Sequence, residues 1–451
     1  MTILRLVLAA LLIYLPNQQM FKLEFTVKGL NVLNMLFLLA VALMVALRVR
    51  APDPAPMRRA FFFFFAVLVW GFAAGLMHDP SEWVNDLTAL KNSIFYMLLF
   101  FLFYHASQDE RTIRFLFGVI LLVTFVAAVQ GLRQALDYGI ATYNETRRVS
   151  APFGWHYTNA NRAAIFFAIF IPLFAAVGLF YRGKILHRLV GLGSTALIAF
   201  VVFFTYSRQA YFILAALVLL VTLRRSVVLS ALIVAALMSF ESWAPETVVE
   251  RIMMTTQVEH ATTAPARSES GREPTYDQST ESRFEIWEGA AAMIADRPWG
   301  VGLNHFKREI GAYAPVYANM DAHNFYVLIT AEAGLLGPVA TLVLLGGLLL
   351  LARRVERLDT RPESRMLGIG FGLSVLAVVM GNIYGSRFLD GDVMGNFWAL
   401  AGLVARYYTL SAQGKRVAAA EAVKAGELGV PAPAWQLPSS ARTRTRPAPD
   451  L

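Results

Sequence analysis

The 451-residue sequence contains no cysteine, and only 16% of its residues are charged. Without a thiol, the chain can form no disulfide, no thiolate nucleophile and no cysteine-ligated metal centre. Soluble domains carry roughly 25% charged residues, whereas here hydrophobic residues reach 57% of the chain. These shortages exclude a typical soluble domain and predict a polytopic membrane protein.

Long apolar runs recur along the chain, and roughly 20 such residues allow a helix to cross the bilayer. The first run, 4–15, contains Arg5 and an apolar stretch as a signal peptide would, but no cleavage site follows it, so we expect a retained helix. We predict an all-α fold with about twelve transmembrane helices, near residues 3–16, 30–48, 60–77, 93–106, 113–134, 162–181, 186–205, 209–223, 226–240, 325–352, 365–385 and 392–410.

The loops between these runs differ in charge. Summed over alternate short loops, the set on the side of the N-terminus carries more Lys and Arg, and because cytoplasmic loops carry this excess, we predict that both termini are cytoplasmic. Residues 1–240 then hold helices one to nine, and residues 325–410 hold helices ten to twelve. Residues 241–324 form one large outer loop that contains short helices. Residues 411–451, rich in Ala, Pro and Arg, are predicted to be a disordered cytoplasmic tail.

Polar residues gather in the stretch from Ser282 to Gly337. Ser282 and Glu285 match a capping box, so we expect a helix to begin there with Arg283 at its first position and to end at Asp296–Pro298. A guanidinium beside free backbone N–H groups favours phosphate binding. The alternative is a surface arginine paired with a neighbouring glutamate.

His323 follows in the same stretch. Asp321 is expected to cap a helix entering the membrane, which places His323 in the first turn. A helix N-terminus lowers the pKa of an imidazole, so His323 is predicted to be neutral and able to accept a proton. The alternative is an interfacial histidine bonded to a neighbouring loop.

Glu332 lies on the opposite face of such a helix from His323 and cannot orient it. A structural hydrogen bond to a neighbouring helix is an equally good interpretation of this acidic residue, which at membrane depth is otherwise a candidate functional group. We expect the helix to break near Gly334–Pro338, because proline is disfavoured inside a helix.

Arg208 lies in a tight outer turn, where the topology rule gives a cation no advantage. Arg208, Arg283 and a neutral histidine would suit a diphosphate leaving group and a hydroxyl nucleophile. The alternative for Arg208 is snorkelling to lipid phosphate.

Asp390 and Asp392 resemble a metal-binding pair, but such a pair in a short loop is typical of a turn, so no metal and no cofactor are predicted. Further candidate substrate contacts are Lys91, Arg147, Arg148, Asn161, Arg162 and Asn324.

The motifs SRFEIW, RPWGVGLNHF, AHNFYVLITAEAGLLG, TYSRQAY and TNANRAA resemble the O-antigen ligase/polymerase superfamily of bacterial membrane glycosyltransferases. The resemblance covers residues 150–340 by motif. It implies a GT-C-like helical fold, a glycan donor linked to undecaprenyl diphosphate, and transfer at the periplasmic face of the inner membrane. It also implies that His323 is the essential histidine and that Arg208 and Arg283 are the family's two arginines.

Within the superfamily, the short polar tail favours an O-antigen ligase, which moves O-antigen polysaccharide onto lipid A–core oligosaccharide. O-antigen polymerase and protein O-oligosaccharyltransferase are the alternatives. A lipid-linked glycan transporter is the alternative from another class, but transporters place ionisable residues at the bilayer midplane, and these spans are nearly free of charge. The expected partners are the donor, the acceptor and membrane lipids, and no nucleic acid is expected.

Overall fold

The computed structural model describes residues 2–21, 31–139, 143–223, 226–253, 278–358 and 362–427, which form helices and loops without a strand. The all-α prediction is therefore confirmed. The first nine helices are α1 (Thr2–Asn17), α2 (Val32–Ala46), α3 (Arg58–His78), α4 (Trp83–Ala106), α5 (Glu110–Tyr138), α6 (Ala160–Phe180), α7 (Ile185–Phe203), α8 (Arg208–Leu223) and α9 (Val227–Met238). The others are α10 (Glu246–Met253), α11 (Gln278–Asp296), α12 (Phe306–Glu309), α13 (Phe325–Ala333), α14 (Leu336–Glu356), α15 (Pro362–Gly381) and α16 (Gly391–Glu427).

Several of these helices meet the requirements for crossing a membrane. Within the described ranges, 7 helices are long and apolar enough, namely α3, α4, α5, α6, α7, α14 and α15. The apolar helices α1, α2, α8 and α9 are shorter, at 10–17 residues. The protein is therefore a multi-pass membrane protein. Each predicted apolar span coincides with one helix, except that residues 325–352 hold two, α13 and α14. The exact number of crossings and the GT-C-like assignment stay predictions.

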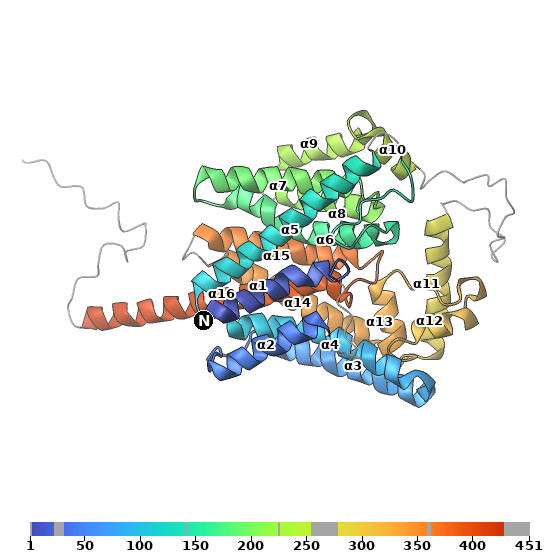
Figure 1. The fold of residues 1–451 in the computed structure, drawn as a ribbon, viewed down its shortest axis with the longest axis horizontal. Helices are drawn as coiled ribbons and strands as arrows, with labels where there is room; N and C mark the ends of the chain where they lie inside the picture. Colours follow the sequence, from blue (N-terminus) through green and yellow to red (C-terminus); the bar gives the residue numbers. More distant parts are fainter. Residues whose placement is uncertain are drawn as a thin grey trace, which may run out of the picture.

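The helices form a bundle whose interior is filled by apolar and aromatic side chains. α6 and α15 pack against each other and are the most buried of the candidate spans. α4 packs along α16, and the ring centroids of Phe61 and Phe100 lie 4.4 Å apart, with Trp398 5.7 Å from Phe61. Figure 1 shows α3 and α4 along one side of the bundle, α7 and α9 along the other, and α11 and α12 beyond one end.

The predicted break at Gly334–Pro338 separates α13 from α14. Gly334 has φ +72°, and a Cβ at this position would lie 2.6 Å from the carbonyl oxygen of Pro298. Glycine is thus required by both the backbone conformation and the close approach of another segment. α13 is a separate short helix that packs against α3 and α11, and the apolar span starts at Leu336.

Some predicted boundaries are wrong. α11 begins at Gln278 and ends at Asp296, so Ser282 does not cap it and Arg283 lies in its second turn, although the predicted end is confirmed. α4 already begins at Trp83, so Lys91 lies on a helix rather than in a loop. α16 continues to Glu427, so the first part of the predicted 411–451 tail is helical. Its alanines favour a helix. Residues 428–451 and 254–277 lie outside the described residues.

Candidate functional site

His323 is half-buried and lies two residues before the start of α13. The predicted place in the first helical turn is wrong, because Asn324 is the N-cap. The Asn324 side chain accepts hydrogen bonds from the backbone N–H groups of Tyr326 and Val327 at 2.9 and 3.2 Å. His323 itself has φ +50°. Non-glycine residues adopt this strained conformation where surrounding contacts hold it, often at functional sites.

Asp321 supplies one of those contacts instead of capping the helix as predicted. Its carboxylate accepts hydrogen bonds from the backbone N–H of His323 at 2.8 Å and from the hydroxyl of Ser386 at 2.7 Å. Lys307 Nζ lies 3.7 Å from the same carboxylate. Asp321 therefore joins the His323 turn to α12 and to residues 382–390, which we call the α15–α16 loop.

The side chain of His323 has positively charged surroundings. Burial lowers its pKa, and the negative charge of Asp321 opposes this effect. The charges of Arg283, Arg387 and Lys307 lower the pKa further. A neutral imidazole has a lone pair that can accept a proton, so this ring is suited to act as a general base. The predicted direction is confirmed, but burial and nearby cations account for it.

Arg283 approaches His323 from α11. Its guanidinium lies over the ring of Tyr384, 5.8 Å from the centroid, which is a cation–π distance. One turn later, Trp287 donates a hydrogen bond from Nε1 to the carbonyl oxygen of Ala322 at 2.7 Å. These contacts hold α11 against both the His323 turn and the α15–α16 loop, so the structure brings Arg283 and His323 together.

Arg208 is half-buried and begins α8 at the same end of the bundle. Its neighbour Gln209 donates to the carbonyl oxygen of Gly381 at 2.8 Å, where α15 ends. The backbone N–H of Phe325 donates to the carbonyl oxygen of Asn382 at 2.9 Å, directly after that end. The α15–α16 loop therefore links the Arg208 turn to the start of α13.

Arg148, predicted to contact substrate, has a side chain that is 6% exposed and engaged in the fold. It donates from Nε to the carbonyl oxygen of Thr205 at 2.9 Å and from Nη2 to Asn161 Oδ1 at 2.8 Å. Glu145 accepts a third bond at 2.9 Å. Because Thr205 precedes the Arg208 turn, Arg148 and Asn161 support that turn.

Arg162 is likewise engaged in an ion pair. Its Nε and Nη2 donate to the two carboxylate oxygens of Asp390 at 2.9 and 2.7 Å, and Nη2 lies 3.5 Å from Asp392. These aspartates thus hold a guanidinium in a bidentate pair. Across the ranges that the structure covers, no three histidine or acidic side chains are placed to hold a metal ion. The other predicted contacts, Lys91 and Arg147, are exposed.

A second polar cluster, which the sequence analysis did not predict, lies where residues 297–305 meet α3, α4 and α13. His305 is fully buried, and its Nε2 lies 2.9 Å from Oδ2 of Asp86 on α4. Asn304 donates from Nδ2 to Asp86 Oδ1 at 3.0 Å, and Arg308 donates to the same oxygen. We refer to Asp86, Asn304, His305 and Arg308 as the Asp86 cluster.

Glu332 lies beside the Asp86 cluster rather than at His323. Its carboxylate accepts a hydrogen bond from the backbone N–H of Phe306 at 3.4 Å, where α12 begins. Burial raises the pKa of Glu332 to about 8. The expectation of a structural hydrogen bond to a neighbouring helix is confirmed, and Glu332 does not orient His323.

The fold and the site define a multi-pass helical membrane protein in which a half-buried histidine is surrounded by cations near the end of its spans. Residues 193–342 of this protein match the family model described as O-Antigen ligase. The match confirms the resemblance seen in the sequence, and its range contains Arg208, Arg283 and His323. A comparison with curated proteins found no match.

Proposed function

We propose that the protein is a glycosyltransferase that moves O-antigen polysaccharide from undecaprenyl diphosphate onto lipid A–core at the periplasmic face of the bacterial inner membrane. The family match and the apolar helices support this class of reaction. The observation that carries the proposal is the surroundings of His323, where burial and three cations lower the pKa of the imidazole and so favour its neutral form. The same cations would attract a donor that carries a diphosphate.

In the proposed reaction, His323 removes the proton from a hydroxyl group on the outer sugar of lipid A–core. The oxygen attacks the anomeric carbon of the O-antigen, and the bond from that carbon to the diphosphate oxygen breaks with inversion. Undecaprenyl diphosphate leaves with the bonding electrons, and Arg208 and Arg283 stabilise its developing charge. The guanidinium groups supply the positive charge, so the proposed reaction is metal-independent.

The test is reconstitution of the full chain with purified lipid-linked O-antigen and rough lipopolysaccharide. General-base catalysis contributes roughly 10²–10⁴-fold, so His323→Ala should lower the rate of transfer by that factor. His156→Ala is the matched control, because His156 is exposed between α5 and α6 and its ring is bonded to Thr158. Transfer by His323→Ala at the wild-type rate would rule out the general-base role.

The same reconstitution separates the alternative functions. A chelator should leave the rate of transfer unchanged, and a loss would contradict metal independence. Longer glycan on the lipid carrier, without a lipopolysaccharide product, would identify a polymerase. Movement of the donor across vesicle membranes without any transfer would identify a transporter.

A further inference from the structure

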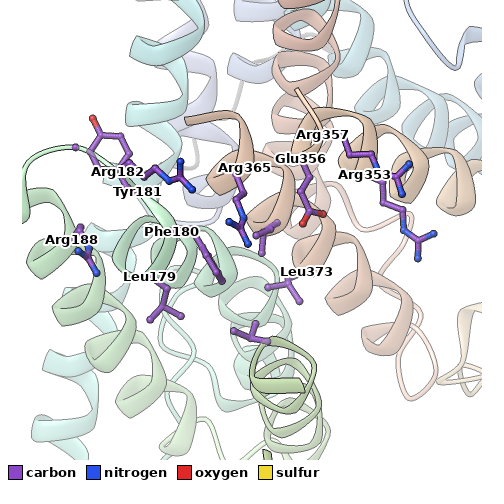
Figure 2. A pocket seen from close by; sticks show the side chains of 13 residues that line it. Leu179, Phe180, Tyr181, Arg182, Arg188, Arg353, Glu356, Arg357, Arg365 and Leu373 are labelled. Atoms are coloured by element: carbon purple, nitrogen blue, oxygen red, sulfur yellow. The ribbon is translucent and has the colours of Figure 1, made fainter. Parts of the chain in front are cut away.

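A second candidate site lies at the other end of the helices that carry the His323 site. A cavity of about 980 Å³ is bordered by the end of α6, the start of α7, the ends of α8 and α14, and the start of α15 (Figure 2). α15 spans Pro362–Gly381, so its two ends are about 30 Å apart at 1.5 Å per residue. The cavity is therefore separate from the proposed transfer site.

The cavity is strongly basic. Its charged lining residues are Glu356 and five arginines from three segments, Arg182, Arg188, Arg353, Arg357 and Arg365. Guanidinium groups stay protonated at every physiological pH and bind phosphate oxygens in a fork geometry. Figure 2 shows Arg353 and Arg357 on one side of Glu356 and Arg182 and Arg365 on the other. An excess of positive charge on several segments favours a phosphate-bearing ligand.

The arginines lie directly beside apolar surface. Leu179, Phe180 and Leu373 also line the cavity, and the guanidinium of Arg365 lies over the ring of Phe180, 6.0 Å from its centroid. The first turns of α7, which carry Arg188, expose four apolar side chains by 58–64%, namely Ile185, Leu186, Leu189 and Val190. Such exposure fits contact with acyl chains, since a soluble protein surface rarely shows so dense an apolar patch.

We propose that this cavity binds an anionic phospholipid, with its phosphate headgroup among the arginines and its acyl chains along Leu179, Phe180 and the first turns of α7. A free phosphate or diphosphate would meet the same guanidinium groups but would leave that apolar surface uncovered. The combination of cations with adjoining apolar surface, close to where spans end, therefore favours the lipid over a soluble anion. This lipid is neither the donor nor the acceptor of the proposed transfer.

The experiment titrates the detergent-solubilised full chain with phosphatidylglycerol or phosphatidylcholine and measures bound lipid by native mass spectrometry. Phosphatidylglycerol, which carries a net negative charge, should bind at least about tenfold more tightly than the zwitterionic phosphatidylcholine. A basic residue near a lipid headgroup contributes about fivefold in affinity, so the double variant Arg353→Gln/Arg365→Gln should weaken binding roughly 30-fold. Arg354→Gln is the matched control, because it removes an exposed arginine next to Arg353 that does not line the cavity.

Helix content measured by circular dichroism checks that each variant folds. If the double variant does not fold, the single variant Arg353→Gln replaces it and should weaken binding about fivefold. Equal binding of the two lipids, or an equal loss with Arg354→Gln, would overturn the proposal. So would inorganic diphosphate that binds as tightly as phosphatidylglycerol and displaces it, since that result identifies a soluble-anion site. The measurement uses neither donor nor acceptor, so its outcome is independent of the proposed transfer.

Discussion

His305 and His323 each have an aspartate as a neighbour, and the two histidines are used differently. The ring of His305 is fully buried and bonded to the carboxylate of Asp86. The ring of His323 is half-buried, and Asp321 bonds to its backbone N–H. Asp86 therefore bonds to the imidazole ring of His305 itself. Asp321 instead holds the backbone of His323, and the imidazole ring of His323 lies near several cations.

This difference separates a structural role from a chemical one. A Cβ at Gly75 of α3 would lie 2.8 Å from His305 Nε2, so the His305 ring is closed off by tight packing, whereas Asn304 at the edge of the Asp86 cluster is exposed. A base must reach a substrate proton, which a sealed ring cannot do. Perturbed titratable groups are functional candidates only when they are accessible. By this criterion His323 is the candidate base and His305 holds residues 297–305 against α4.

The largest effect on stability is expected from Asp86→Ala. Removing one partner of a buried ion pair typically costs 3–5 kcal/mol, roughly, because the other charge is left uncompensated. We expect a loss of that order in the free energy of unfolding, measured by thermal or denaturant unfolding in detergent. His323→Ala should leave the unfolding transition nearly unchanged, and equal stabilities of the two variants would abolish the distinction between the clusters.

Much of the fold could be predicted from the sequence because apolar runs and helix breakers act locally. The break at Gly334 and the end of α11 at Asp296 follow from such signals. Cap positions were harder, because several polar residues compete at each helix start. At α13, Asn324 is the cap, and Asp321, three residues earlier, bonds to His323 and Ser386.

The Asp86 cluster could not be predicted in this way, because Asp86 and His305 are 219 residues apart. The sequence contains only a weak indication of this cluster, namely the two glycines shortly before His305. Gly300 and Gly302 have φ +101° and +119°, and a Cβ on Gly302 would lie 2.4 Å from Cα of Gly75. Glycines in a loop can indicate such close approach, but they do not identify which helix lies opposite.

An effect of comparable size, but dependent on pH, is expected at Glu332, which lies beside the Asp86 cluster. Its pKa is raised by burial from 4.5 to about 8, so the folded state holds a proton that the unfolded state releases between these pH values. Stability is then highest below about pH 4.5 and falls as the pH rises toward about 8, by at most about 1.4 kcal/mol per unit. Glu332→Gln, which keeps an acceptor for the Phe306 N–H, should flatten the pH dependence of the melting temperature between pH 5 and 8. An unchanged slope would contradict the raised pKa.

The smallest expected effects are shifts of the pH–rate profile caused by substitutions beside His323. Two such substitutions should shift the profile in opposite directions. If transfer requires neutral His323, the rate rises with pH through the pKa of this ring. Lys307→Gln removes a cation that lowers this pKa, so the acidic limb of the pH–rate profile should move to higher pH. Asp321→Asn removes the anion that raises it, so the limb should move to lower pH, while the amide oxygen can still accept from His323 and Ser386.

The two shifts should also differ in size. The Lys307 side chain is 57% exposed, so solvent screening should make the shift caused by Lys307→Gln the smaller of the two. Asp321 is less exposed and bonded to the backbone of His323, so its removal should move the limb further than the loss of Lys307. His305→Asn provides the contrast, because a ring that only supports the fold should lower the amount of folded protein without moving the limb. Shifts of the same sign for Lys307→Gln and Asp321→Asn would show that a group other than His323 controls the rate.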